Sequence, residues 1–386
     1  MQNNPTGVVP DSVNNTITNK HFKFTGKGLE YFSIWIVNVV LTILTLGIYS
    51  AWAKVRTNQY FYGNTFLDGS SFRYTAKPLQ ILKGRIIATI LFAIYYFTTI
   101  ANPIVAGIIL IIIMLFVPAF VVMAMSFRLR NSQYRNVHFN FDKNFSQAYK
   151  VFFIPLIFVG CYLFLIGQAE HLQPGDREQS GNAIFGLLIL GVMLGIFVMV
   201  PWWEFIVTRF KATHAKYGQA DFSFSATLKN YYGMYLKALL LSIIIFGLLG
   251  AGIFTLQKTQ PDEQSQLLFA SMMSIFVFPA YLWLFAYFQT KRTNLLFGNL
   301  SINGHHVRSE MTTGRLLMLY ITNTLAIMLT FGLLMPWAKV RTANYKASIT
   351  SLDVAGELNQ FVTSQEQQQS AMGEEIGEMF DLDLGF

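Results

Sequence analysis

Long apolar runs alternate with short polar segments along most of this chain. A helix that crosses a hydrocarbon layer of ~30 Å needs about 20 residues, and six of the runs reach about that length. They are Ile81–Ile100, Ile104–Phe127, Val151–Gln168, Ala183–Thr208, Leu236–Leu256 and Leu267–Thr290. The six runs fall into three pairs, so the pattern predicts three helical hairpins in a membrane.

Basic residues gather between these pairs and not within them. The connector inside the first pair is Ala101-Asn102-Pro103, which carries no charge. The segments after the first and second pairs are strongly basic and contain Arg128, Arg130, Arg135, Lys143 and Lys150, and then Arg209, Lys211, Lys216 and Lys229. Loops rich in Lys and Arg stay in the cytoplasm, so the basic connectors are expected inside and the turns within pairs outside.

Two further apolar stretches, Leu29–Leu46 and Leu316–Leu334, break this pattern. If each crossed the membrane, the basic residues after Lys339 would lie outside, against the same rule. We therefore favour a re-entrant or interfacial hairpin that turns near Gly47 or Gly332. Such backbone is stable at membrane depth only where protein covers it. The alternative is that both stretches span, which gives eight helices in all.

The chain also contains internal repeats. Asn38–Tyr60 and Asn323–Tyr345 align without gaps and share the run Trp-Ala-Lys-Val-Arg-Thr. A second repeat relates the middle segments at constant spacing, and its matched positions are Pro118, Arg128, Tyr134, Phe139 and Phe141 against Pro201, Lys211, Tyr217, Phe222 and Phe224. The sets Arg56, Tyr62, Asn64 and Leu67, and Lys291, Phe297, Asn299 and Ile302, fit the same frame. Repeated units of this kind predict a pseudo-symmetric arrangement.

Each unit combines an apolar helix pair with a short segment of alternating polarity, such as Val137–Phe141. Asp68-Gly69 and Asn303-Gly304 carry hairpin-turn chemistry at related places. We predict four short strand elements at the cytoplasmic membrane surface, which could pair into a small sheet or collar. The predicted fold class is therefore all-α and multi-pass, with short cytoplasmic β elements between pseudo-repeats.

Three regions follow from this reading. Residues 1–20 are polar and Asn-rich and are expected to form a disordered lead. Residues 21–350 make up the membrane domain. Residues 351–386 form an acidic, Gln-rich tail that is expected to be mostly disordered.

Composition agrees with a membrane location. The chain is 53% hydrophobic and 12% charged, whereas a soluble domain has roughly 25% charged residues. All 28 Lys and Arg residues lie within the first 346 positions, which carry a net charge of +16. This excess favours anionic lipid headgroups as partners, and no groove-reading motif points to nucleic acid. The single cysteine, Cys161, excludes a disulfide framework.

One phrase in the chain resembles a known family. The residues are Thr45-Leu46-Gly47-Ile48-Tyr49-Ser50-Ala51-Trp52-Ala53-Lys54-Val55-Arg56, then Phe61-Tyr62-Gly63-Asn64-Thr65, with Phe22-Lys23-Phe24-Thr25-Gly26 upstream. Together they resemble the YjgN-like family of bacterial inner-membrane proteins, over about residues 21–346. Ala51 departs from the pattern, because the second copy has Pro336 there. The resemblance implies a multi-pass protein of the bacterial inner (cytoplasmic) membrane and no activity, because the family is a domain of unknown function.

The two Trp-Ala-Lys-Val-Arg-Thr segments are the first candidate sites. In each, a Lys and an Arg lie beside an indole, a combination that suits phosphate of a lipid headgroup or substrate. The residues are Trp52, Lys54 and Arg56 in the first copy and Trp337, Lys339 and Arg341 in the second. The plainer alternative is that they only anchor the chain at the interface.

Three polar residues are candidates within the membrane. Glu204 could relay protons or bind a cation, or could pair with Arg209 or Lys211. Asn38 and Asn323 are mirrored in the two terminal stretches and could share a polar cavity or bond across helices.

No catalytic motif, cofactor site or metal site emerges from the sequence. His305-His306 lie beside a turn without Cys or carboxylates at metal spacing, and they are expected to be exposed. A transporter or channel for a small molecule, ion or lipid is the favoured function. A membrane scaffold or regulatory protein is the alternative, and an intramembrane enzyme ranks third. The oligomeric state, substrate and coupling ion stay open.

Overall fold

The computed structural model describes residues 17–171, 181–259 and 263–383 of the chain. Ten short strands are present in this part. They are β1 (Ile17–Phe24), β2 (Thr65–Leu67), β3 (Ser70–Tyr74), β4 (Ser132–Tyr134), β5 (Val137–Phe141), β6 (Ala215–Tyr217), β7 (Ala220–Phe224), β8 (Leu300–Ile302), β9 (His305–Ser309) and β10 (Thr350–Ala355). Each strand pairs antiparallel with its neighbours in sequence, and β1 also pairs with β10, so the sheet closes into a barrel.

Helix pairs connect the strands in a regular order. Their bounds are α1 (Gly28–Leu44), α2 (Ser50–Gly63), α3 (Pro78–Ala101), α4 (Pro103–Arg130), α5 (Phe145–His171), α6 (Gly181–Thr213), α7 (Leu228–Thr259), α8 (Glu263–Phe297), α9 (Thr313–Leu329) and α10 (Met335–Ser348), followed by α11 (Leu358–Asp383). In each case a strand leads into two helices and then into the next strand, as in β3–α3–α4–β4. Five such units build the chain from β1 to β10.

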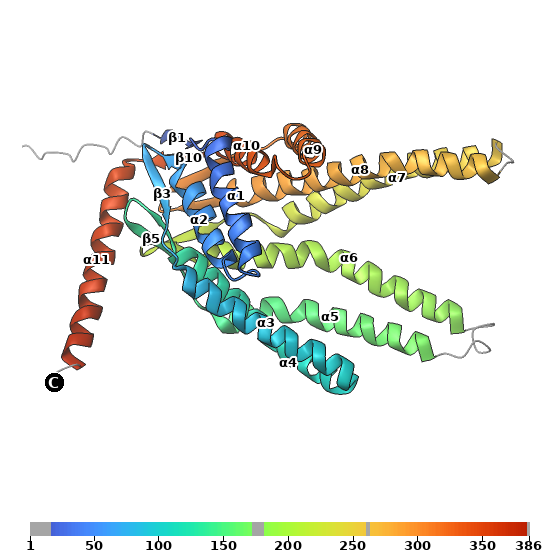
Figure 1. The fold of residues 1–386 in the computed structure, drawn as a ribbon, viewed down its shortest axis with the longest axis horizontal. Helices are drawn as coiled ribbons and strands as arrows, with labels where there is room; N and C mark the ends of the chain where they lie inside the picture. Colours follow the sequence, from blue (N-terminus) through green and yellow to red (C-terminus); the bar gives the residue numbers. More distant parts are fainter. Residues whose placement is uncertain (1–16, 172–180, 260–262, 384–386) are drawn as a thin grey trace, which may run out of the picture.

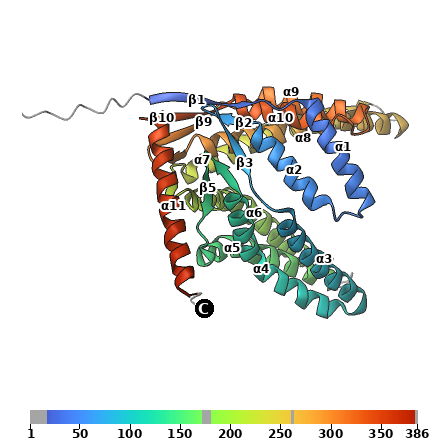
Figure 2. The ribbon, with the colours of Figure 1, turned by 60° about the vertical axis from the view of Figure 1, so that its left-hand side comes forward.

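The topology places all five helix pairs at one end of the barrel. Connections between successive antiparallel strands alternate between the two ends of a sheet. The strand-to-strand links through helices are therefore at one end, and the four tight turns are at the other. Figures 1 and 2 show this arrangement, with the helix pairs running out from the barrel on one side and α11 lying on the opposite side.

The tight turns have the backbone that their residues favour. Both central residues of the β2–β3 turn have positive φ, 46° at Asp68 and 75° at Gly69, and the β8–β9 turn has 46° at Asn303 and 82° at Gly304. This is the geometry of a two-residue type I′ hairpin, which Asn-Gly and Asp-Gly favour. Both predicted turn dipeptides therefore connect the strands of a hairpin.

Alternate side chains of the strands line the lumen of the barrel. Val137 and Phe139 of β5, and Ala220 and Phe222 of β7, belong to one apolar cluster that includes residues from around the barrel wall. Its other barrel members are Phe22, Leu67, Phe72, Tyr134, Tyr217, Ile302, Val307, Leu352 and Val354. Because side chains of a strand alternate between faces, one face of each short strand suffices to build this core.

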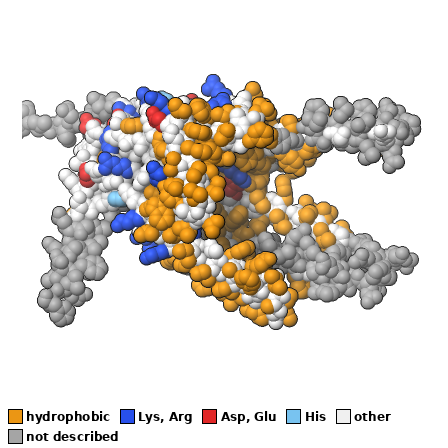
Figure 3. All heavy atoms as spheres, in the orientation of Figure 1, with side chains coloured by type: hydrophobic (Ala, Val, Ile, Leu, Met, Phe, Trp, Pro, Cys, Tyr) orange, Lys and Arg blue, Asp and Glu red, His pale blue; other side chains and the backbone are white. Residues whose placement is uncertain are grey.

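Four helices of the described residues are long and apolar enough to cross a membrane. They span Pro78–Ala101, Pro103–Arg130, Gly186–Thr213 and Leu228–Gly252, and 0% to 11% of the most apolar window in each is buried. Large side chains such as Ile111 and Phe116 are therefore exposed. On the face shown, hydrophobic side chains cover much of the described helical part, whereas Lys and Arg gather over the barrel and its junction with the helices (Figure 3). Such apolar helices fit a membrane protein.

The all-α fold class predicted from the sequence is wrong, because ten strands of the described residues close a complete barrel, where four short elements in a small sheet or collar were expected. The count of eight spanning segments is also wrong, since four candidates are found in the described part of the chain. The predicted runs Val151–Gln168 and Leu267–Thr290 fall on α5 and α8, and many of their side chains lie outside the described residues. Strands of three residues are too short to show an alternating pattern.

The terminal stretches form two short helix pairs. α1 and α9 each have 17 residues, and α2 and α10 each have 14. Gly47 has φ 91° and Gly332 has φ 93°, so both turns occur where the sequence predicts them. The left-handed backbone explains why glycine occupies both positions.

The ends of the chain join the barrel. Residues 1–16 of the expected N-terminal lead lie outside the described residues, and Ile17–Lys20 belong to β1. The segment after residue 350 contributes β10 and α11. Leu358, Phe361 and Val362 of α11 pack on the lumen cluster, so the helix covers the barrel at the end that carries the tight turns.

Candidate functional site

A cavity of about 1090 Å³ occupies the centre of the molecule. All ten strands contribute lining residues, and so do α2, α6, α7, α8, α10 and α11. On α6 the lining extends from Val200 to Lys211, which corresponds to about 16 Å along the helix. The cavity therefore continues from the lumen of the barrel into the space between the helices.

Equivalent positions of successive units line this cavity. The aligned residues Tyr62, Tyr134, Tyr217 and Phe297 all contribute to its wall. Tyr217 donates a hydrogen bond from its hydroxyl to the carbonyl oxygen of Tyr134 at 3.0 Å, and Tyr134 donates in the same way to Leu67 at 2.8 Å. Burial raises the pKa of Tyr134 to about 12, so its hydroxyl remains a donor. These bonds fix neighbouring units to one another inside the barrel.

An ion pair lies on the helical side of the cavity. Arg292 of α8 contacts the carboxylate of Glu204 on α6 with two nitrogens, Nε to Oε1 at 2.7 Å and Nη2 to Oε2 at 2.8 Å. The hydroxyl of Tyr235 on α7 also donates to Oε2 of Glu204 and accepts from Arg292 Nη2 at 3.0 Å. Three helices are therefore tied together at one polar point, and a two-pronged pair of this kind is among the stronger ion pairs.

The observed partner of Glu204 differs from the partners that the sequence predicts. Arg209 and Lys211 were the expected partners, but the carboxylate pairs with Arg292, 88 positions away in the chain. The side chain of Glu204 keeps 17% of its surface exposed, all three groups line the cavity, and Lys211 lines it separately. Glu204 is thus the sequence candidate that the structure places in the central cavity.

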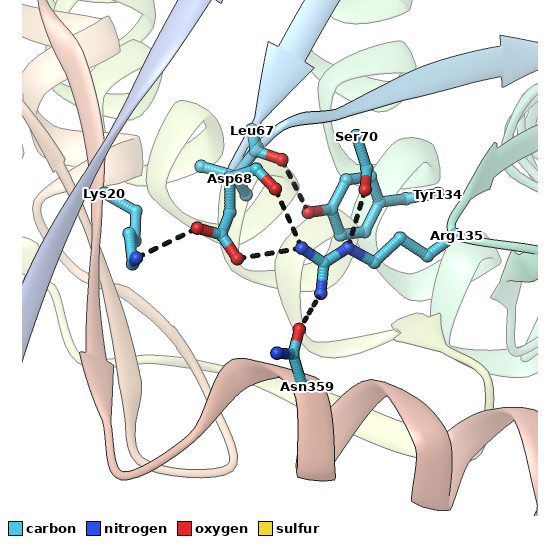
Figure 4. A network of polar contacts seen from close by, with 7 residues as sticks. All are labelled: Lys20, Leu67, Asp68, Ser70, Tyr134, Arg135 and Asn359. Atoms are coloured by element: carbon cyan, nitrogen blue, oxygen red, sulfur yellow. Dashed lines mark hydrogen bonds and ion pairs between the residues drawn. The ribbon is translucent and has the colours of Figure 1, made fainter.

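A second polar network closes the opposite end of the barrel (Figure 4). Asp68, in the β2–β3 turn, binds Lys20 of β1 at 2.9 Å and Arg135 of the β4–β5 turn at 2.8 Å. Arg135 also donates to Ser70 at 2.9 Å and to Asn359 of α11 at 2.6 Å. Lys20 is the largest cause that lowers the pKa of the Asp68 carboxyl, and Arg135 adds to it. Charge-assisted bonds therefore link adjacent turns to α11.

Further contacts fix α11 over the barrel. Gln365 accepts hydrogen bonds from the backbone of Gln219 at 2.8 Å and of Ala220 at 3.0 Å. The ring of Phe361 lies 5.9 Å from that of Tyr217 and 4.9 Å from that of His305. Polar contacts at the turns and aromatic contacts in the lumen thus act on the same helix.

His305 is buried beneath α11, contrary to the expectation of exposure. Its side chain lines the cavity, the residue is 2% exposed, and Nδ1 accepts a hydrogen bond from the backbone of Ala355 at 3.1 Å. Burial lowers the pKa of the imidazole, with a smaller contribution from the neighbouring His306. The ring is therefore neutral at physiological pH. In the described residues no group of three His, Cys, Asp or Glu could hold a metal ion.

Comparison with known proteins places the chain in a family. Residues 19–379 match the family described as "Bacterial protein of unknown function (DUF898)". The chain belongs to this family. It is similar to "Inner membrane protein YjgN" of Salmonella typhimurium, with 25% identity over 378 residues that cover 90% of this chain and 92% of that protein. It is also similar to "Inner membrane protein YjgN" of Escherichia coli K12, with 23% identity over 361 residues that cover 86% and 88% of the two chains. No solved structure matches this DUF898 chain.

The two Trp-Ala-Lys-Val-Arg-Thr segments of the DUF898 chain occupy α2 and α10, outside the central cavity. Lys54, Arg56, Lys339 and Arg341 are exposed, and Trp52 is half-buried. Arg56 donates a hydrogen bond at 3.0 Å to the hydroxyl of Tyr49, which lies seven positions earlier in the chain.

The two tryptophans have different surroundings. A side chain added at Gly28 of α1 would meet the indole of Trp337 at 2.7 Å, so Trp337 packs directly on that backbone. Trp52 instead stacks on Tyr49, with ring centres 6.1 Å apart. The sequence identity of the segments therefore does not give them identical contacts.

The mirrored asparagines also differ, and neither lines the central cavity. Asn323 is buried, donates to Ala338 and Thr342 at 3.3 Å each, and accepts from Arg341 at 3.0 Å. Its bonds thus lie within the α9–α10 pair. Asn38 is 5% exposed, and neither polar atom of its side chain has a hydrogen-bond partner among the described residues.

Sequence reasoning missed Arg292, Tyr235 and the covering role of α11. Arg292 and Tyr235 are distant in sequence from Glu204, and no local pattern connects them. For α11 a signal does exist, because Leu358, Phe361, Val362 and Gln365 recur at i, i+3, i+4 and i+7, the spacing of one helical face. The acidic composition of the tail obscured this pattern.

Proposed function

We propose that this protein is a multi-pass transporter or channel of the bacterial inner membrane, and that the central cavity is its substrate chamber. The single observation that carries the proposal is the continuity of the cavity from the barrel lumen to Val200 and Glu204 on α6. Sites for small molecules are concave and mostly apolar, with a few converging polar groups. Glu204, Arg292 and Tyr235 are such a group, contributed by three different helices.

The arrangement of the helix pairs supports a topology. Both ends of each pair are anchored in the barrel, so every pair enters and leaves the membrane on the barrel side. Lys and Arg gather over the barrel and its junction with the helices (Figure 3), and basic segments stay in the cytoplasm. We therefore place the barrel and α11 in the cytoplasm. The exposed Lys54 and Lys339 would then meet anionic headgroups.

A membrane scaffold or regulatory protein is the second candidate. The observation that favours it is the closure of the barrel by α11, with Phe361 and Val362 buried against the lumen cluster. An intramembrane enzyme is less favoured. The only carboxylate that lines the cavity in the described residues is Glu204, and it is already paired with Arg292.

Cysteine accessibility tests the transport proposal. The chain has one cysteine, so Cys161→Ser gives a cysteine-free background, and Thr208→Cys then adds one thiol in the cavity wall. A small, charged methanethiosulfonate reagent is applied separately to spheroplasts and to inside-out vesicles. A transporter or channel should expose Thr208→Cys to both sides. Ser364→Cys on α11 is the matched control and should react only in inside-out vesicles.

Labelling of Thr208→Cys from one side only would contradict a transport route and would favour the scaffold. Untargeted metabolite and lipid profiling of a deletion strain against its parent then gives an independent route to the transported molecule.

A further inference from the structure

The charged groups that line the central cavity are mostly positive. Lys211, Arg292 and Lys346 contribute three positive charges, and Glu204 contributes the one negative charge among the described lining residues. Since Arg292 and Glu204 neutralise each other through two contacts, Lys211 and Lys346 account for the positive excess.

Both lysines lie at the junction of barrel and helices, and both line the same cavity. Lys211 is in the last turn of α6, before β6, and Lys346 is in the last turn of α10, before β10. Neither forms an ion pair with an acidic side chain in the part of the chain that the structure describes. Two unpaired ammonium groups facing one cavity form a site that attracts an anion.

Lys211 is also placed on the same helix face as the ion pair. Glu204, Thr208 and Lys211 are spaced at i, i+4 and i+7 on α6, and all three line the cavity. Thr208 therefore lies between the ion pair and a free ammonium group on this face, and its side chain hydrogen-bonds Tyr231, which also lines the cavity.

The rest of the cavity wall is mostly apolar and rich in aromatic rings. Phe72 stacks on Tyr134 with ring centres 4.8 Å apart, and Phe139 lies 5.0 Å from Tyr217. Further lumen rings include Phe22, Phe222 and Phe361. Burying the apolar part of a ligand against such rings is favourable in proportion to the apolar surface that it removes from water.

We propose that this cavity binds an amphiphilic organic anion, a molecule with one anionic head and an apolar body. The head lies between Lys211 and Lys346 at the junction, and the body lies against the aromatic rings of the barrel. The inference deepens the proposed function by naming the substrate class, and its binding part stands without transport. A fatty acid and a lysophospholipid share this chemistry and differ in carrying a carboxylate or a phosphate.

A displacement assay in zwitterionic nanodiscs tests the head-group requirement. The full chain is loaded with a dansyl-labelled undecanoate, and empty nanodiscs supply the blank. Competitors of equal chain length are dodecanoate, dodecyl phosphate, dodecanol and dodecylammonium. Both anions are expected to displace the probe at concentrations at least about tenfold below those of the alcohol and the amine. The reason is that only the anionic heads can form charge-assisted hydrogen bonds with the lysine ammonium groups. Displacement by dodecanol as effective as by dodecanoate would overturn the proposal. A preference between the two anions identifies the carboxylate or phosphate source.

Variants locate the site. Lys211→Gln should weaken binding of the anionic probe about tenfold, and Thr208→Trp should obstruct the cavity and weaken the alcohol and the anions alike. Lys229→Gln is the matched control, because Lys229 is an exposed lysine at the start of α7 that does not line the cavity. Equal affinity of the Lys211→Gln and Lys229→Gln variants would overturn the assignment. Should Lys211→Gln fail to fold, Lys346→Gln gives the same comparison.

Transport is measured separately, as protein-dependent movement of the dansyl-labelled undecanoate into liposomes. Anion-selective binding without movement would refute the transport proposal and leave this inference intact. Movement of the probe without anion-selective binding would refute this inference and leave the transport proposal intact.

Discussion

The guanidinium of Arg135 joins two neighbouring hairpin turns by donating to the carboxylate of Asp68 at 2.8 Å. The same guanidinium donates to the carbonyl oxygen of Asp68 at 2.9 Å and to Asn359 of α11. Arg135 itself has a positive φ of 45°, so its backbone makes the turn while its side chain binds the next turn. One residue thus joins two neighbouring turns and the covering helix.

Replacing Arg135 should loosen α11. Arg135→Met removes donors to Asp68, Ser70 and Asn359, and we expect a loss of about 2 kcal/mol in stability. Hydrogen exchange followed by mass spectrometry should show faster exchange of the α11 amides. Lys216→Met is the control, because Lys216 pairs with an Asp221 side chain that is 66% exposed. Loss of this ion pair should change the free energy of unfolding by about 0–1 kcal/mol. Equal exchange in both variants would contradict the role given to Arg135.

The aromatic contact of α11 gives a second prediction. Phe361 is buried against Tyr217 and His305, and a buried Phe→Ala change costs about 3–5 kcal/mol. Because α11 is a single helix that covers one end of the barrel, Phe361→Ala should release it while the barrel strands keep their protection. Gln360→Ala changes the exposed face of the same helix and should leave exchange unchanged. A uniform loss of protection in barrel and helix would show that α11 is inseparable from the barrel.

Helix pairing was visible in the sequence, because apolar runs and basic connectors carry strong local signals. The hairpin turns Asp68-Gly69 and Asn303-Gly304 were equally visible, since two positive φ angles favour those residues. The closed barrel could not be predicted from the sequence. Thr65–Leu67 has three residues, and closure depends on a pairing of β1 with β10 between chain positions more than 300 residues apart.

The cavity was visible only in part. The repeat frame aligned Tyr134 with Tyr217, but it did not show that both rings face one lumen. Glu204 was singled out as a polar candidate within the membrane, while its partner Arg292 depended on how two helix pairs are arranged around the barrel. Local patterns therefore identified individual groups, and the three-dimensional arrangement determined which of them meet.

Acidification should destabilise the covered barrel through His305. The imidazole is 2% exposed and its pKa is lowered, so the unfolded chain binds a proton more readily than the folded one. Its stabilising contribution is present above the unfolded pKa of about 6.5 and is lost as the pH falls below it. Protonation of Nδ1 would also remove the acceptor for the Ala355 amide.

The measurement is the thermal unfolding midpoint of the purified protein between about pH 8 and about pH 5. The midpoint of the wild-type protein should fall more than that of His305→Asn, which keeps an acceptor and does not titrate. His306→Gln should retain most of the fall, because His306 is exposed and is only the smaller cause of the shift. Parallel midpoints of the wild-type protein and His305→Asn would refute the assignment.

The ion pair between Glu204 and Arg292 allows the sharpest test of how the helices are held together. Arg292→Met leaves the carboxylate of Glu204, which is 17% exposed, without its two-pronged partner, and we expect a loss of about 2 kcal/mol. Glu204→Gln in the same chain removes the orphaned charge and should restore part of the stability, because an unpaired buried charge costs more than an absent pair. A double-mutant cycle on thermal unfolding measures this coupling. Additive effects of the two changes would mean that other contacts hold α6 and α8 together. Glu204 and Arg292 would then be available to bind a ligand without loss of stability.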